Sequence, residues 1–399
     1  MTAAGEDDRI AALDLIRGLG VLGILLVNAI AFAQPIQVYD NPTLSPVALS
    51  HADLATWWAI ATFCRDKFVT LFSLLFGVSL FLVGREQRRS DPAYRTPLFR
   101  RLAWLALFGL VHGAVIWLGD ILLLYAVTGF IFWRWRHAAT GRLLAWGASV
   151  FLLGAACQVL PFILQPDLQP SVTDIRPQLV IMRGDVLSSL GGNARAWAHG
   201  VFGNLTFFLP TTLGLMMLGL GLFKGGFLRG TASARIYVAA MAAAAVCLVV
   251  IGVQARVIMA HGCPFPQTFG IYGVANTVLC LPVALGYAGA LILADRTALG
   301  HRLLHPLACA GRMAFTNYLT QSLVMTMLFY GGRGPGLFGT MNPWGLVPVV
   351  VAIWIAQLAV STAWLSHFRY GPFEWGWRCL TYGRRVAMVR SSPTSASGR

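Results

Sequence analysis

Hydrophobic residues occur along this chain in long blocks separated by short stretches rich in Gly, Pro and Arg. A helix needs roughly 20 apolar residues to cross the hydrocarbon core of a bilayer, and most of the blocks approach that length. The pattern predicts an all-α fold, a polytopic membrane protein with about ten transmembrane helices. The predicted spans lie near residues 18–35, 66–84, 100–118, 120–136, 143–164, 204–223, 236–259, 271–294, 308–330 and 345–366.

The segments between the blocks are short except at 36–53 and 165–200, which are predicted to be outer loops. The second of these contains a stretch of mixed polarity, Gln178 to Trp197, which predicts a short surface helix. Residues 1–390 are therefore expected to form a single transmembrane domain. The Ser-rich residues 391–399 are expected to be a disordered tail.

Composition and charge agree with this interpretation. Apolar residues make up 57% of the 399 residues and charged residues only 11%, whereas a soluble domain is about one-quarter charged. A soluble enzyme is thus excluded. The net charge of +15 does not indicate nucleic acid, because the basic residues are scattered between apolar blocks. Most of them fall on the side of the N-terminus, which predicts that both termini are cytoplasmic.

Polar side chains within the predicted spans are costly in lipid, so each is a candidate functional residue, with hydrogen bonding between helices as the alternative. His112 and Asp120 flank a turn predicted at 117–119, which would bring them to the same depth. A carboxylate beside a histidine orients a general base, and a structural bond that closes the hairpin is the alternative. Asn28 can donate a hydrogen bond to a developing oxyanion or join two helices.

Three arginines near the predicted inner ends of spans, Arg17, Arg101 and Arg312, suit an anionic, phosphate-bearing coenzyme. A structural pair between Arg312 and Glu374 is the alternative. Lys67 can bind an anionic group or extend to the lipid headgroups, and the second interpretation is favoured.

Asn317 and Gln321 are four residues apart and share a helix face, so they either line a cavity or bond a neighbouring helix. The seven cysteines form no CxxC motif and have no histidine at ligand spacing, so no metal site is predicted. Walker, HExxH and GxSxG motifs are missing, and no serine or cysteine nucleophile is predicted.

Five stretches of the sequence, taken in order, resemble the YeiB family of bacterial inner-membrane proteins. They are Leu13-Asp14-x-x-Arg17-Gly18 with Asn28, Lys67 through Gly77, His112 through Tyr125, Gly311 through Tyr318, and Gly371 through Thr381. The resemblance implies a multi-pass protein of the bacterial inner membrane, with membrane lipids as its surroundings.

The family is similar, more distantly, to two groups of transmembrane acyltransferases. Acyltransferase-3 proteins carry an Arg in the first helix and a His eleven positions later, where this chain has Arg17 and Asn28. The heparan-α-glucosaminide N-acetyltransferases place an Asn on this helix and a His in the next outer loop, where this chain has His51. Because Asn cannot take a proton, the base is left open between His112 and His51.

The resemblance implies acyl transfer from cytoplasmic acyl-coenzyme A to an extracytoplasmic glycan or lipid acceptor. His112 and Asp120 would deprotonate the acceptor, Asn28 would stabilise the oxyanion, and the three arginines would hold the coenzyme. The candidates for contact with the acceptor are Lys67, Asn317, Gln321 and His51. The competing interpretation is a transporter or lipid-binding membrane protein that performs no chemistry.

Overall fold

The computed structural model describes residues 11–83, 95–160, 172–264, 267–268 and 270–390. Within these ranges the regular elements are helices, and no strand is formed. Seven of the described helices are long and apolar enough to cross a membrane. The prediction of an all-α polytopic membrane protein is confirmed. The predicted tail, 391–399, lies outside the described residues.

Most of the predicted spans correspond to single helices. The seven long helices are α1 (Ala11–Ala33), α5 (Arg95–Val111) continued by η4 (His112–Ile116), α7 (Thr140–Cys157), α10 (Val186–Lys224), α11 (Ala234–Ala260), α13 (Ile271–Asp295) and α16 (Pro343–His367). Shorter helices occupy three further predicted spans, namely α4 (Lys67–Leu82), α6 (Leu122–Phe132) and α15 (Ala314–Phe329). The remaining elements are α2 (Ile36–Asp40), η2 (Pro42–Leu44), α3 (His51–Phe63), η5 (Trp133–Trp135), α9 (Val172–Arg183), α14 (Ala298–Arg312) and α17 (Pro372–Tyr382).

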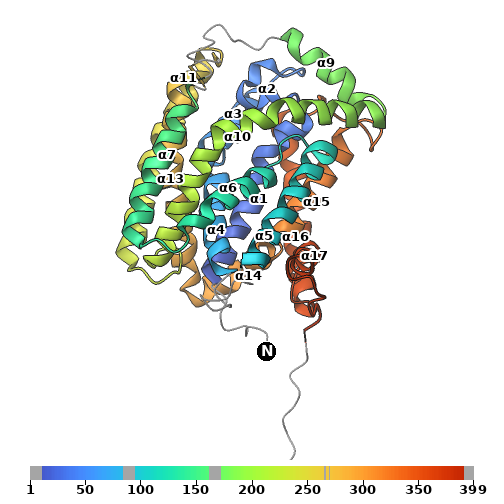
Figure 1. Ribbon diagram of the computed structural model, residues 1–399. Coiled ribbons are helices and arrows are strands. Elements are labelled where there is room, and N and C mark those ends of the chain that lie inside the picture. The colour runs from blue at the N-terminus through green and yellow to red at the C-terminus, as the bar shows by residue number, and fades with distance from the viewer. Residues whose placement is uncertain (1–10, 84–94, 161–171, 265–266, 269, 391–399) are drawn as a thin grey trace, which may run out of the picture.

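The first helix, α1, is the central element of the bundle and packs against α4, α13, α14, α15 and α16 (Figure 1). Its start lies at the same end of the molecule as α17, and α9 lies at the opposite end. We call these two ends the α17 face and the α9 face. Helices α7, α11 and α13 form one side of the bundle, and α15, α16 and α17 form the other.

Two glycines let α1 and α14 touch. A Cβ atom on Gly311 would collide with the carbonyl oxygen of Asp14, and one on Gly18 would collide with that of Leu307. Only a residue without a side chain permits this approach of two backbones. The contact holds the ends of α1 and α14 together beside the site described below.

The predicted span 308–330 is not one helix, because the chain turns at Met313 between α14 and α15. The Glu374 carboxylate of α17 accepts hydrogen bonds from the backbone N–H groups of Phe315 and Thr316, at 2.7 and 3.0 Å. The carboxylate thereby satisfies N–H groups that have no partner within the helix at the start of α15. Its negative charge also interacts favourably with the positive end of the helix dipole. The cap from α17 therefore stabilises the start of α15 after the break.

Both predicted outer loops contain helices whose bounds the hydrophobic pattern did not indicate. Helix α3 begins at His51 because Ser50 and Asp53 form a reciprocal capping box. In the described part of the second loop, Asp185 caps α10 by accepting a hydrogen bond from the Ser188 backbone N–H at 2.8 Å. The single surface helix predicted over 178–197 is therefore wrong. The chain forms α9 and then α10, which continues unbroken into the predicted span 204–223.

Candidate functional site

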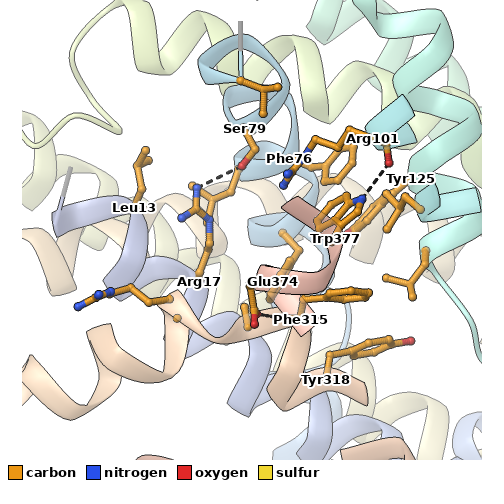
Figure 2. Close-up of a pocket in the computed structure, with 18 of the residues that line it drawn as sticks. Leu13, Arg17, Phe76, Ser79, Arg101, Tyr125, Phe315, Tyr318, Glu374 and Trp377 are labelled. Carbon is orange, nitrogen blue, oxygen red and sulfur yellow. Dashed lines mark hydrogen bonds between the residues drawn. The ribbon is translucent and has the colours of Figure 1, made fainter. Parts of the chain in front are cut away.

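A cavity of about 380 Å³ lies between α1, α4, α5, α6, α14, α15 and α17 (Figure 2). Its end at the α17 face is cationic, lined by Arg17, Arg101, Arg312 and Arg378. Four guanidinium groups outnumber the two carboxylates in the wall, those of Asp14 and Glu374. The three arginines assigned to an anion site from the sequence therefore line one cavity, although they come from three different helices.

Two of these arginines are held by contacts with the cavity wall. Arg17 pairs with Asp14 at 2.7 Å and donates a hydrogen bond to the Ser79 hydroxyl at 3.1 Å (Figure 2). The Arg101 guanidinium lies 3.6 Å above the centre of the Trp377 ring, and the indole N–H of Trp377 donates to the Arg101 carbonyl at 3.0 Å. Both guanidinium groups keep further N–H groups with which to bind an anion.

The other end of the cavity is apolar and aromatic. The lining there includes Ile24, Phe72, Leu75, Phe76, Ile121, Leu122, Tyr125 and Tyr318. The rings of Phe76 and Tyr125 stack with their centroids 5.1 Å apart, and the Tyr125 hydroxyl lies 3.1 Å from the Ser73 hydroxyl. The centroid of the Tyr318 ring is 5.1 Å from that of His112, so this deep end of the cavity adjoins His112.

His112 and Asp120 meet as the predicted turn requires. The Nδ1 atom of His112 lies 3.0 Å from Oδ1 of Asp120, and both side chains are 1% exposed. The carboxylate also accepts hydrogen bonds from the backbone N–H groups of Leu122 and Leu123, at 3.1 and 2.9 Å. The start of α6 therefore fixes the carboxylate, and the carboxylate fixes the imidazole ring.

Ser322 of α15 is the second partner of the imidazole. Its Oγ atom lies 2.9 Å from Nε2 of His112, so the two ring nitrogens bind a carboxylate on one side and a hydroxyl on the other. Sequence analysis missed this serine. The two residues are 210 positions apart in the chain, and no motif surrounds Ser322 that could have indicated the contact.

Asn193 of α10 holds the irregular turn that carries His112. Its side-chain N–H groups donate to the carbonyl oxygens of Gly113 and Ala114 at 2.9 and 3.0 Å, and its side-chain oxygen accepts from the Leu118 N–H at 2.8 Å. These are backbone groups of η4, a π-helical turn, and of the residues just after it. Asn193 is completely buried and was also missed, because it falls in the segment predicted to be an outer loop.

Asn28 lies on the same face of α1 as two residues of the cavity wall. Seven residues separate Arg17 from Ile24 and eleven separate Arg17 from Asn28, and both spacings are close to whole helical turns. Asn28 is half-buried, about 16 Å along the helix from Arg17, and lies beyond the lining residues. Its amide has no hydrogen-bond partner among the described residues.

Lys67 does not extend to the lipid headgroups, and that interpretation is wrong. The residue is completely buried, with Nζ 3.1 Å from the Ala61 carbonyl and 3.4 Å from Oδ1 of Asn276. The Asn276 amide also donates to Asp66 at 2.8 Å. This network joins the corner between α3 and α4 to α13, and none of its members lines the cavity.

Asn317 and Gln321 bond neighbouring helices, which is the second of the alternatives that their spacing left open. The Asn317 amide donates to Ser361 at 3.1 Å, and the Gln321 amide donates to Gln357 at 2.8 Å. Neither residue lines the cavity. His51 is exposed at the start of α3, and no carboxylate pairs with it in the described part of the chain. The geometry required of an oriented base is therefore found at His112.

Comparison with known proteins identifies relatives that are similar over nearly the whole length of this chain. Residues 222–384 match a family described as "Protein of unknown function (DUF418)". Over 404 residues the chain is 33% identical to the Escherichia coli (strain K12) protein YeiB, covering 97% of this chain and 100% of the relative. The chain belongs to the YeiB family. The resemblance predicted from the five sequence stretches is therefore confirmed.

Two further YeiB-like relatives are found in Bacillus. YxaH of Bacillus subtilis (strain 168) is 30% identical, covering 94% of this chain and 95% of the relative. A 39.9 kDa protein from the amylase 3' region of Bacillus acidopullulyticus is 27% identical, covering 96% of each chain. All three relatives are named as uncharacterized proteins, so they establish the family and assign no activity to this chain.

Proposed function

We propose that this member of the YeiB family is a transmembrane acyltransferase of the bacterial inner membrane. It would take an acyl group from cytoplasmic acyl-coenzyme A at the α17 face and transfer it to a glycan or lipid on the other side. The observation that carries the proposal is the single cavity that runs from four arginines to the aromatic residues beside His112. An acyl-coenzyme A has a phosphate-bearing nucleotide, which suits the arginines, and a long arm that ends in the acyl group, which suits the aromatic end.

Each end of the cavity would bind a different part of the donor. Guanidinium groups bind phosphate oxygens in a forked geometry, so Arg17, Arg101 and Arg312 would hold the nucleotide end. The aromatic end would hold the acyl group and the arm that carries its thioester. The volume of about 380 Å³ lies within the range of small-molecule sites, roughly 300–1,000 Å³. A donor larger than the cavity would leave its nucleotide end at the mouth, among the arginines.

The groups beside the deep end supply acid and base. Neutral His112 takes the proton of the acceptor hydroxyl or amine at Nε2, while Asp120 at Nδ1 stabilises the imidazolium that forms. The acceptor attacks the thioester carbonyl, and the carbon–sulfur bond breaks. The departing coenzyme thiolate then receives the proton from His112. Asn28, whose amide has no partner in the described structure, is assigned to the oxyanion of the intermediate.

The test is turnover by purified protein in nanodiscs of bacterial inner-membrane lipid, supplied with acetyl- or palmitoyl-coenzyme A and with an envelope-glycan extract. The lipid and the extract provide the two classes of acceptor, and the reaction is followed by release of the free coenzyme thiol. We expect release by the wild-type protein and an increase in melting temperature with either donor, because the donor binds only the folded state. Stabilisation without release would favour the lipid-binding or transport alternative. Absence of both at millimolar donor would refute the proposal.

A further inference from the structure

We propose that Ser322 is a covalent nucleophile that carries the acyl group between donor and acceptor. This inference rests on the proposed function and deepens it, because it changes the reaction from direct transfer to transfer in two steps. The juxtaposition that carries it is the chain of contacts from Ser322 through His112 to Asp120.

The three side chains have the geometry of a nucleophile, a base and an orienting acid. Ser322 Oγ is 2.9 Å from His112 Nε2, and His112 Nδ1 is 3.0 Å from Asp120 Oδ1. Such a triad is recognised by contacts and roles and not by order in the chain. Two backbone N–H groups at the start of α6 hold the carboxylate, so the acid cannot turn away from the ring.

The place of Ser322 along α15 suits a relay. Helix α15 begins beside α17. Two residues after its end, Gly331 donates its backbone N–H to the Met182 carbonyl of α9. The helix therefore runs from the α17 face to the α9 face. Ser322 lies near its middle, one turn beyond Tyr318 of the cavity wall. An acyl group on Ser322 would stand past the deep end of the cavity, toward the α9 face. Donor and acceptor then need not meet in the membrane.

The first step moves the Ser322 hydroxyl proton to Nε2 of His112 as Oγ attacks the thioester carbonyl. The carbon–sulfur bond breaks, the thiolate leaves with the proton from His112, and an oxygen ester remains on Ser322. In the second step the acceptor hydroxyl gives its proton to His112 and attacks the ester. The bond to Oγ breaks and Ser322 recovers the proton. Both steps use only donor, acceptor and these three side chains.

The experiment uses the full chain in nanodiscs and two probes. Acyl-radiolabelled acetyl- and palmitoyl-coenzyme A test the first step, and an alkyl fluorophosphonate tests the nucleophile without any coenzyme. Peptide mapping locates the label. The variants are Ser322→Ala, Ser322→Cys, and Ser189→Ala as the matched control, a fully buried serine of α10 outside the site. Melting temperature is recorded for each variant.

We expect both probes to modify Ser322 in the wild-type and Ser189→Ala proteins. Ser322→Ala should lose both labels and at least about a thousandfold of the turnover. Ser322→Cys keeps a nucleophile of similar size, so its acyl label should become sensitive to neutral hydroxylamine, as a thioester is and an oxygen ester is not. This variant keeps the test decisive if Ser322→Ala fails to fold.

Two results would overturn the inference. One is a folded Ser322→Ala protein whose turnover is within a few fold of wild type, which would leave direct transfer standing. The other is wild-type protein that turns over donor with neither probe attached to Ser322. A failure of the proposed function looks different, because fluorophosphonate would still mark Ser322 in a protein that neither binds nor consumes acyl-coenzyme A.

Discussion

Two faces of α15 carry buried polar side chains of different chemistry. On one face, Asn317 and Gln321 bond Ser361 and Gln357 of α16, and amide groups neither take nor release a proton near neutral pH. On the other face, Ser322 contacts His112, and Tyr318 of the cavity wall packs beside that imidazole. Polarity within a membrane helix therefore does not by itself identify a site. A titratable group next to a cavity is the stronger indication.

The largest effect is expected on the face toward His112. His112→Ala should lower turnover by about a thousandfold or more, since it removes the proton acceptor. Asp120→Asn should lower it severely, because the charge that stabilises the imidazolium is lost. Thiol release per folded molecule measures both variants. A folded His112→Ala protein with full turnover would move the role of base to His51.

A smaller effect is expected at Asn193, whose side-chain hydrogen bonds in the described part of the chain all go to the turn that carries His112 and the residues just after it. Asn193→Leu should lower kcat roughly tenfold to a hundredfold with little change in KM, because small displacements of a positioned base cost that much. Asn193→Asp keeps the acceptor for the Leu118 N–H and should recover part of the loss. Steady-state kinetics of the two variants, with melting curves, distinguish positioning from a purely structural role. Equal kcat values in the wild-type, Asn193→Leu and Asn193→Asp proteins would exclude a positioning role for Asn193.

The arginine end of the cavity should affect donor binding more than chemistry. Arg101→Gln should raise the KM for acyl-coenzyme A about tenfold while kcat stays within a few fold, since one charge-assisted phosphate contact is worth roughly 1.5–3 kcal/mol. Arg256→Gln serves as the control, because Arg256 lies on α11 and does not line the cavity. Identical KM values in the two variants would remove Arg101 from the donor site.

The smallest effect on turnover is expected on the amide face. Gln321→Leu breaks the bonds to Gln357 and to the Val21 carbonyl, and should cost about 1 kcal/mol of stability. Turnover per folded molecule should stay within a few fold of wild type. Unfolding in detergent and thiol release on the same preparation give the two numbers. Loss of turnover at unchanged stability would show that the amide face belongs to the site.

Much of the architecture could be predicted from the sequence, because every helix that crosses the lipid needs a long run of apolar residues. Apolar length located most of the spans. The starts of α3 and α10 could not be found this way, because capping groups set them, namely Ser50 with Asp53 at α3 and Asp185 at α10. The break at Met313 could not be found either, because the group that caps the following helix, Glu374 of α17, is far away in the chain.

The candidate site was predictable only where its residues are neighbours in sequence. His112 and Asp120 are eight positions apart around a turn, so their contact could be anticipated. Ser322 and Asn193 reach the same turn from distant helices, and tertiary packing alone reveals them. For Lys67 the sequence prediction was wrong. A lysine at a helix end favoured the lipid headgroups, yet Lys67 is buried and Asn276 of α13, distant in sequence, is its partner.

The central claim is that the cavity binds an acyl donor and that His112 beside it performs the transfer. The most direct measurement is thiol release from acyl-coenzyme A by wild-type and His112→Ala proteins, reconstituted in parallel in bacterial inner-membrane lipid with the envelope-glycan extract and matched for folded fraction. The account predicts release by the wild type at a rate proportional to protein, and background release by the variant. Equal rates in the two folded proteins, or no release by the wild type with either acyl chain, would contradict it.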